Sequence, residues 1–143
     1  MKDEASSLWM YGDPENYDLK IEIAKKHNIK PQNIVVGEGI DGLLGYLVRM
    51  LVEPNDNVVT TDGSYPTFNY HVNGYAGLLK KIPFKEDFED LASLSSFSKK
   101  LRPKIVYVSN PNNPMGTFNN KTDIQTFINE VPDDSIICLD EAY

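Results

Sequence analysis

The chain has 143 residues, of which 41% are hydrophobic and 24% charged, a balance that fits one globular domain with a substantial core. Its net charge is −7, from 14 basic and 21 acidic residues, so nucleic acid and anionic membrane surfaces are not expected as partners. No apolar run approaches the roughly 20 residues of a membrane span, and the start lacks the apolar core of a signal peptide, so we expect a cytoplasmic protein.

Helical and extended patterns alternate along the chain after an irregular segment at residues 1–16. The clearest pattern is a helix that begins at Ile40, where apolar residues recur three, four, seven, eight and eleven positions later. We expect helices over 16–27, 40–51, around 68–72, within 85–101 and over 121–130, and strands over 34–36, 57–61, 78–84, 104–108 and 135–139. This alternation, without a repeat or a linker, predicts an α/β fold with a doubly wound, mainly parallel sheet.

Three residues within these elements carry further expectations. Asn16 is a good N-cap for the first helix, and Phe97 lies on the apolar face of the helix within 85–101. The single cysteine, Cys138, lies in the apolar run of the last strand, so we expect it to be a small buried core residue. We expect no metal site.

A stiff polar loop follows the strand over 104–108, at residues 109–116 (SNPNNPMG). Its two Asn-Pro steps exclude a helix, because proline pushes the preceding residue out of the α region. We expect the carboxamides of Asn110, Asn112 and Asn113 at the carboxyl end of the strand, where open α/β sheets bind ligands. A polar turn without a ligand is the alternative that turn statistics support.

A glycine loop at residues 37–42 (GEGIDG) precedes the clearest helix and matches the dinucleotide-binding pattern G-x-G-x-x-G. Asp62 ends the next strand, twenty positions after Gly42, so a nicotinamide-binding Rossmann domain is one interpretation. In either case the glycines allow close approach of the backbone, and the helix N-terminus offers N–H groups and a positive dipole end to a phosphate. A tight turn without a ligand is a third interpretation.

A nicotinamide site gives no use to Tyr65, which precedes a proline, to Asn113, or to residues 140–143 (DEAY). Together with the glycine loop, in this order and at these intervals, these residues make the chain resemble the fold-type I pyridoxal-phosphate aminotransferases of class I/II. The resemblance is strongest to the histidinol-phosphate aminotransferase branch and covers nearly the whole chain. It implies that residues 17–143 are part of the large domain that binds pyridoxal 5′-phosphate.

The resemblance implies a catalytic role for Asp140, which in the family pairs with the protonated pyridine nitrogen of the cofactor and keeps the ring able to absorb electrons. Tyr143, a second catalytic candidate, and Asn113 match the residues that hydrogen-bond the phenolic oxygen of the cofactor. Tyr65 matches the aromatic residue that stacks on the ring. The alternatives are a helix-capping or strand-end role for Asp140 and ordinary core packing for Tyr65.

The backbone N–H groups of Gly39, Ile40 and Asp41 are implied to hold the phosphate of the cofactor, although the Asp41 side chain can instead cap the helix. Tyr11 resembles the tyrosine that reaches the phosphate of the neighbouring subunit, which implies a homodimer. A surface or core tyrosine is the alternative for that position. Met115 departs from the family pattern, in which a threonine is usual.

The lysine that binds the cofactor in this family would lie beyond Tyr143, where the chain ends. We therefore expect the N-terminal part of a transaminase that is unable to transaminate alone, with an exposed apolar edge on the strand over 135–139. The implied reaction transfers an amino group between an amino acid or amine, such as histidinol phosphate, and a 2-oxo acid. A nicotinamide-dependent oxidoreductase, a decarboxylase of the same fold and a non-catalytic remnant remain as alternatives.

Overall fold

The computed structural model describes residues 4–143. They form two compact units, which are divided between Glu38 and Gly39. The expected division of the chain at residue 16 stays a prediction. In the part of the chain that the structure describes, no helix has the length and apolar character needed to cross a membrane.

The first unit contains an α-helix and two short 3-10 helices. They are η1 (Glu4–Ser7), α1 (Tyr17–His27) and η2 (Pro31–Asn33). The predicted strand over 34–36 is wrong. Ile34 has extended backbone angles, φ −117° and ψ 125°, but no strand within residues 4–143 pairs with this segment, and the side chain of Val35 is exposed. An apolar run forms a strand only where a neighbouring strand supplies hydrogen-bond partners.

The start of α1 is capped by a residue other than the expected one. Asn16 lies at the N-cap position, but its side chain makes no capping hydrogen bond. The carboxylate of Asp13 instead accepts hydrogen bonds from the N–H of Tyr17 at 2.6 Å and the N–H of Glu15 at 2.9 Å. These two bonds lower the pKa of Asp13, as expected for a carboxylate that satisfies free N–H groups at a helix start.

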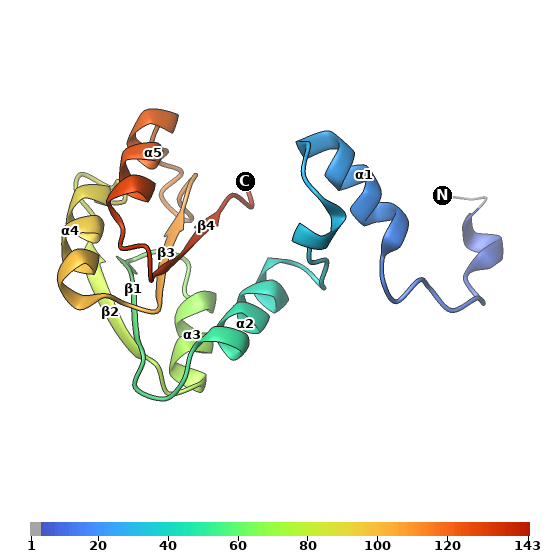
Figure 1. Cartoon of the computed structure of the whole chain (residues 1–143), viewed down its shortest axis with the longest axis horizontal. Coiled ribbons are helices and arrows are strands. Elements are labelled where there is room, and N and C mark those ends of the chain that lie inside the picture. Colours follow the sequence, from blue (N-terminus) through green and yellow to red (C-terminus); the bar gives the residue numbers. More distant parts are fainter. Residues whose placement is uncertain (1–3) are drawn as a thin grey trace. The chain divides into compact units, whose positions relative to one another are not determined.

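The second unit is a parallel sheet with helices between its strands (Figure 1). Its elements are α2 (Ile40–Leu51), β1 (Asn57–Asp62), α3 (Thr67–Gly74), β2 (Leu78–Pro83), α4 (Leu91–Leu101), β3 (Ile105–Ser109), α5 (Lys121–Glu130) and β4 (Ile136–Asp140). The strands are ordered β2-β1-β3-β4, and each neighbouring pair is parallel. The predicted α/β fold with a doubly wound, parallel sheet is confirmed.

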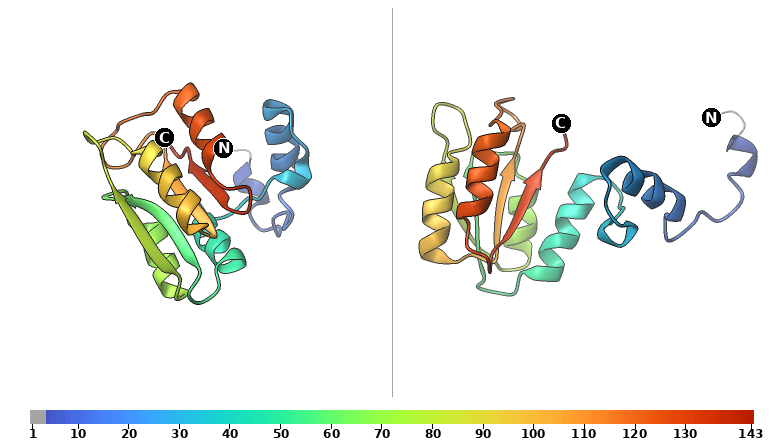
Figure 2. Two further views of the ribbon diagram at one scale, coloured as in Figure 1. Left: turned by 60° about the vertical axis from the view of Figure 1, so that its left-hand side comes forward. Right: turned by 45° about the horizontal axis from the view of Figure 1, so that its top comes forward.

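Helices cover both faces of the sheet (Figures 1 and 2). On one face, α2 and α3 pack on a core that includes Val58 of β1 and Ile105 and Tyr107 of β3. On the other face, α4 and α5 pack on a core that includes Val59 of β1 and Val106 of β3. Neighbouring strand residues enter different cores because successive side chains of a strand point to opposite faces.

The carboxyl ends of β1 and β3 lie next to each other where the strand order reverses. The chain leaves β1 toward α3 on one face and leaves β3 toward α5 on the other face (Figure 2). In doubly wound sheets, the crevice at such a reversal is where ligands bind. The loops after β1, β3 and β4 therefore form the rim on which functional residues are expected.

The helix predicted within 85–101 is shorter than that range. It begins at Leu91, where Asp90 accepts a capping hydrogen bond, while Lys85 and Phe88 close a tight turn through two backbone bonds of 3.0 Å. Phe97, which we expected on the buried face, is 36% exposed. The buried face of α4 is formed instead by leucine and serine side chains.

β4 is an edge strand in the described part of the sheet, because it pairs with β3 alone. Ile136 at its start is 38% exposed, so this edge is apolar and open, as expected. Cys138 is half-buried rather than buried. Burial and the nearby charge of Asp140 raise the pKa of its thiol to about 11, so Cys138 stays protonated and behaves as a small apolar side chain.

Candidate active site

Backbone hydrogen bonds join the loops at the rim of the sheet. The N–H of Tyr65, in the loop after β1, donates to the carbonyl of Asn113, in the loop after β3, at 2.8 Å. The N–H of Asn110 donates to the carbonyl of Asp140, at the end of β4, at 2.9 Å. The structure therefore brings three of the predicted site residues, Tyr65, Asn113 and Asp140, to the same rim.

Two donors hold the carboxylate of Asp140. The hydroxyl of Tyr107, on the neighbouring strand β3, donates to Oδ2 at 2.7 Å, and the N–H of Ala142 donates to Oδ1 at 3.0 Å. Tyr107 is buried, and its ring stacks on Phe68 of α3 with the ring centroids 4.3 Å apart. Burial, with the hydrogen bond to Asp140, raises the pKa of Tyr107 above its ordinary value, so the hydroxyl stays protonated and donates.

Two hydrogen-bonding side chains lie next to each other on the same rim. Asn113 Nδ2 donates to the hydroxyl oxygen of Tyr143 at 3.4 Å. The side chains of Tyr143 and Tyr65 are 79% and 47% exposed, so both rings are open to solvent. A carboxamide and a phenol can both donate to one oxygen atom of a ligand without adding net charge.

The N-terminus of α2 is open. Gly39 precedes the helix with φ +90° and ψ 174°, a conformation essentially restricted to glycine, and as the N-cap residue it offers no side chain to cap the helix. Asp41 lies in the first turn with its side chain exposed. The first helical bond runs from the N–H of Leu43 to the carbonyl of Gly39. The N–H groups of Ile40 and Asp41 precede this bond, so they have no acceptor within the helix. By contrast, α4 and α5 each begin with a side-chain cap.

His71 of α3 fixes this first turn of α2. Its Nε2–H donates to the carbonyl of Asp41 at 3.1 Å. The helices approach closely because Gly45 has no side chain, and a Cβ there would lie 2.8 Å from Cε1 of His71. The loop that carries Tyr65 leads directly into α3. The packing of α3 against α2 therefore links the position of this loop to the open end of α2.

A buried polar cluster, which we did not predict from the sequence, lies beneath the loops after β1 and β3. At its centre is Glu89, 3% exposed, immediately before α4. The Glu89 carboxylate accepts hydrogen bonds from Asn112 Nδ2 at 2.8 Å, Ser64 Oγ at 2.9 Å, Ser109 Oγ at 3.1 Å and Thr61 Oγ1. Burial raises the pKa of Glu89, and the bonds from its partners oppose that rise. We call these five residues the Glu89 cluster.

Two of the three asparagines of the Asn-Pro loop point into the protein. Asn112 belongs to the Glu89 cluster, and Asn110 makes bonds of 3.0 and 2.7 Å with the main chain of Asn119. Both side chains are buried. The expectation that Asn110 and Asn112 present their carboxamides to a ligand is therefore wrong, because the loop uses them to satisfy buried groups of its own. Asn113 is the asparagine of this loop that reaches the rim.

Tyr11 lies between η1 and α1 in the first unit, and its side chain is fully exposed. Trp9 and Met10 beside it are exposed as well. Contiguous exposed apolar side chains are typical of a surface that contacts another molecule. The expected contact of Tyr11 with the phosphate of a neighbouring subunit stays a prediction.

The glycine loop lacks the structural context of a dinucleotide site. That fingerprint requires a strand directly before the loop, and residues 34–36 form none. Asp62, the candidate ribose ligand, instead forms an ion pair with Lys81 of β2, with Nζ and Oδ1 3.2 Å apart. The structure therefore does not favour the nicotinamide interpretation.

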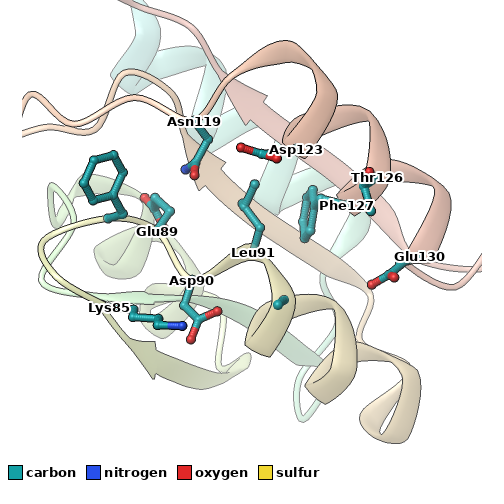
Figure 3. A pocket seen from close by; sticks show the side chains of 11 residues that line it. Lys85, Glu89, Asp90, Leu91, Asn119, Asp123, Thr126, Phe127 and Glu130 are labelled. Carbon is teal, nitrogen blue, oxygen red and sulfur yellow. The ribbon is translucent and has the colours of Figure 1, made fainter.

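A pocket of about 350 Å³ lies beside the Glu89 cluster, between the start of α4 and one side of α5 (Figure 3). Among the described residues, its lining includes none of the predicted cofactor-binding residues. Its charged side chains are Glu89, Asp90, Asp123, Glu130 and Lys85. Because carboxylates predominate, this pocket disfavours an anionic ligand, in contrast to the open N-terminus of α2.

Comparison with known proteins identifies the family. The model of the family "Aminotransferase class I and II" matches residues 2–143. The chain belongs to this family. Histidinol-phosphate aminotransferase 2 of Carboxydothermus hydrogenoformans is 33% identical to this chain over 143 residues, which are 100% of this chain and 39% of that protein.

Solved structures show the same relationship. The crystal structure of histidinol-phosphate aminotransferase from Sinorhizobium meliloti in complex with pyridoxal-5′-phosphate superposes with a TM-score of 0.94 and 44% identity, over 99% of this chain and 39% of that one. An alanine aminotransferase from Pyrococcus furiosus superposes with a TM-score of 0.78 and 26% identity, again over 99% of this chain and 39% of that one. The chain thus spans about two-fifths of the length of these relatives.

Proposed function

We propose that this chain is the N-terminal part of an aminotransferase that uses pyridoxal 5′-phosphate and transfers an amino group from an amino acid or amine to a 2-oxo acid. The observation that carries the proposal is the carboxylate of Asp140, which Tyr107 holds at 2.7 Å on the rim of the sheet. A fixed carboxylate at this place suits the protonated nitrogen of a pyridine ring. When bound, the cofactor supplies a ring that accepts electrons from the substrate.

The other rim residues fit the rest of such a ring. Tyr65 presents a half-exposed aromatic side chain, which suits stacking on a flat heterocycle. Asn113 Nδ2 and the Tyr143 hydroxyl lie 3.4 Å apart, so both can direct a proton donor at the phenolic oxygen of the cofactor. In this assignment Asp140 holds a proton at the pyridine nitrogen, and Tyr143 and Asn113 orient the ring.

The start of α2 fits the phosphate. Gly39, the N-cap residue, has no side chain to compete with an anion for the N–H groups of Gly39, Ile40 and Asp41, and the positive end of the helix dipole favours an anion there. A Cβ built on Gly39 meets no atom within 4 Å, so the space beside this backbone is open. The exposed Tyr11 would reach the phosphate bound by a second copy, and the complete enzyme would then be a homodimer with shared sites.

The two histidinol-phosphate aminotransferases named above support an amino donor of the histidinol phosphate kind, with a 2-oxo acid as acceptor. Residues 17–143 would form part of the large, cofactor-binding domain. Because the chain spans about two-fifths of its relatives, we propose that it does not transaminate alone. Detectable amino-group exchange by the 143-residue chain with pyridoxal phosphate would contradict this point.

The test uses the complete gene product that contains this chain. We expect it to bind pyridoxal phosphate and to transfer the amino group of histidinol phosphate to a 2-oxo acid. Asp140→Asn removes the negative charge while keeping the shape of the side chain, and should lower the rate on the order of a hundredfold or more. Asp62→Asn, which also neutralises a carboxylate at a strand end, should retain full activity. Absence of cofactor binding would overturn the proposal. With an amino acid in place of histidinol phosphate, release of its carboxylate as carbon dioxide without consumption of the 2-oxo acid would indicate a decarboxylase instead.

A further inference from the structure

Glu89 connects the two loops that carry Tyr65 and Asn113. Its Oε1 atom accepts a hydrogen bond from Ser64 Oγ at 2.9 Å and one from Asn112 Nδ2 at 2.8 Å. Ser64 directly precedes Tyr65, and Asn112 directly precedes Asn113. One carboxylate oxygen therefore fixes the residue before each of two groups that the proposed function assigns to the cofactor ring.

The same carboxylate is anchored in the centre of the sheet. Thr61 Oγ1, near the end of β1, donates to Oε2, while the hydroxyl and the N–H of Ser109, at the end of β3, donate to Oε1 at 3.1 and 3.4 Å. Thr61 and Ser109 are both buried, and β1 and β3 are the two central strands. Glu89 therefore joins the two loops to the part of the sheet with partners on both sides.

A carboxylate suits this position because its partners are all donors. An ionised carboxyl group only accepts hydrogen bonds, and here it receives bonds from three hydroxyls, one carboxamide and one backbone N–H. An apolar side chain at position 89 would remove this acceptor from the buried hydroxyls of Thr61, Ser64 and Ser109. Asn112 Nδ2 would keep only its longer bonds of 3.1 Å to Ser64 Oγ and Ser109 Oγ. Such a loss costs more than the bond itself, so we expect Ser64 and Asn112 to reorient toward other acceptors.

We propose that Glu89 is a positioning residue for cofactor binding, which orients Tyr65 and Asn113 through Ser64 and Asn112 without contacting the cofactor. Tyr65 and Asn113 are themselves joined by a backbone hydrogen bond of 2.8 Å, so displacement of either loop moves both residues. The inference rests on the proposed function, because it is that function which gives Tyr65 and Asn113 a ligand.

The first experiment measures the loops without any cofactor. Hydrogen exchange of residues 62–66 and 110–117 is followed in the cofactor-free complete gene product and in Glu89→Leu and Glu89→Gln. Leu94→Ala is the matched control, because Leu94 is a buried residue of α4 in the neighbouring core and its truncation weakens the fold by a cavity. We expect faster exchange of both loops in Glu89→Leu, less in Glu89→Gln, which keeps one accepting oxygen, and no loop effect in Leu94→Ala. Unchanged exchange of both loops in Glu89→Leu and Glu89→Gln would overturn the proposal.

The second experiment measures pyridoxal phosphate affinity by equilibrium dialysis. Glu89→Leu should weaken binding about tenfold, the equivalent of one hydrogen bond lost at the ring. Glu89→Gln should weaken it less, and Leu94→Ala should leave it unchanged. Wild-type affinity in Glu89→Leu, or an equal loss in Leu94→Ala, would overturn the role of Glu89. Failure of the wild type to bind overturns the proposed function instead, and the exchange data then decide alone whether Glu89 orients the loops.

Discussion

The hydroxyl of Tyr107 donates to Oδ2 of Asp140 at 2.7 Å, across the pairing of β3 with β4. Tyr107 is buried and its ring is stacked on Phe68, so the donor itself has little freedom to move. The carboxylate at the rim is therefore positioned from inside the core. Such support favours ligand binding, because a carboxylate that is already oriented loses less conformational entropy when the ligand binds.

Tyr107→Phe tests this support. The substitution removes the hydroxyl and keeps the ring stacked on Phe68, so we expect the free energy of unfolding to fall by about 1 kcal/mol, the net worth of one hydrogen bond. Cofactor affinity should fall as well, because Asp140 then lacks its buried donor. Urea unfolding and pyridoxal phosphate titration of the complete gene product measure the two effects. Unchanged values for both would show that the hydrogen bond to Asp140 contributes nothing.

Gly39→Ala tests the open start of α2. At φ +90° and ψ 174° a side chain is strained whatever the space around it, so we expect a loss of about 2 kcal/mol in the free energy of unfolding. Phosphate binding should weaken too, because the first turn must rearrange. Gly74→Ala is the matched control, since Gly74 ends α3 in an ordinary conformation with open space for a Cβ. A Gly39→Ala protein as stable as Gly74→Ala would contradict this account of the turn.

Most elements of the second unit were predictable because their signals are local. The apolar spacing after Ile40 and the β-branched run of β3 determine a helix and a buried strand by periodicity alone. The segment over 34–36 has the same apolar composition, but strand formation depends on a partner that local sequence does not reveal. The turn before α4 was missed for a related reason. Glu86 and Asp87 adopt positive φ there, which their residue types do not indicate.

The Asn-Pro loop alone indicated a place at the rim for Asn113, but the roles of the rim residues were predicted only through resemblance to a family. No local pattern distinguishes Tyr65 from a core residue. Tyr107 and Glu89 were missed altogether. Tyr107 contacts Asp140 across 33 positions, and Glu89 contacts Asn112 across 23 positions. Both contacts follow from the order of the strands, not from neighbours in the sequence. Glu89 lies between Phe88 and Asp90, the cap of α4, and nothing in this local sequence indicates that its side chain is buried.

Asp90→Ala tests the cap that sets the start of α4. Asp90 accepts the N–H of Ser93 at 3.0 Å, and its loss should lower the free energy of unfolding by about 1 kcal/mol. This bond lowers the pKa of Asp90 below 3.8. The contribution of the Asp90 charge to the free energy of unfolding is therefore present above pH 3.8 and is lost as the pH falls through the lowered pKa. Asp90→Asn keeps a capping oxygen without the charge. It should remain within a few tenths of a kcal/mol of the wild type at neutral pH, and an equal loss in both variants would contradict a capping role.

Glu89 predicts a pH dependence of the opposite sign. Burial raises the pKa of Glu89 above 4.5, so the folded state holds its proton more tightly than the unfolded state does. The contribution of Glu89 to stability is then fully present below about pH 4.5 and declines as the pH rises through the raised pKa, with a slope of at most about 1.4 kcal/mol per pH unit.

The measurement is the free energy of unfolding of the wild type and of Glu89→Gln over a series of pH values. Because glutamine does not titrate, the difference between the two proteins isolates the proton on Glu89. We expect the wild type to lose stability relative to Glu89→Gln as the pH rises from about 4.5 toward neutrality. A relative gain over that range would mean that the donors from Ser64, Ser109 and Asn112 outweigh burial and hold the carboxylate ionised. That outcome would mean that the pKa of Glu89 is lowered in the folded protein, while the geometry of the Glu89 cluster stays the same.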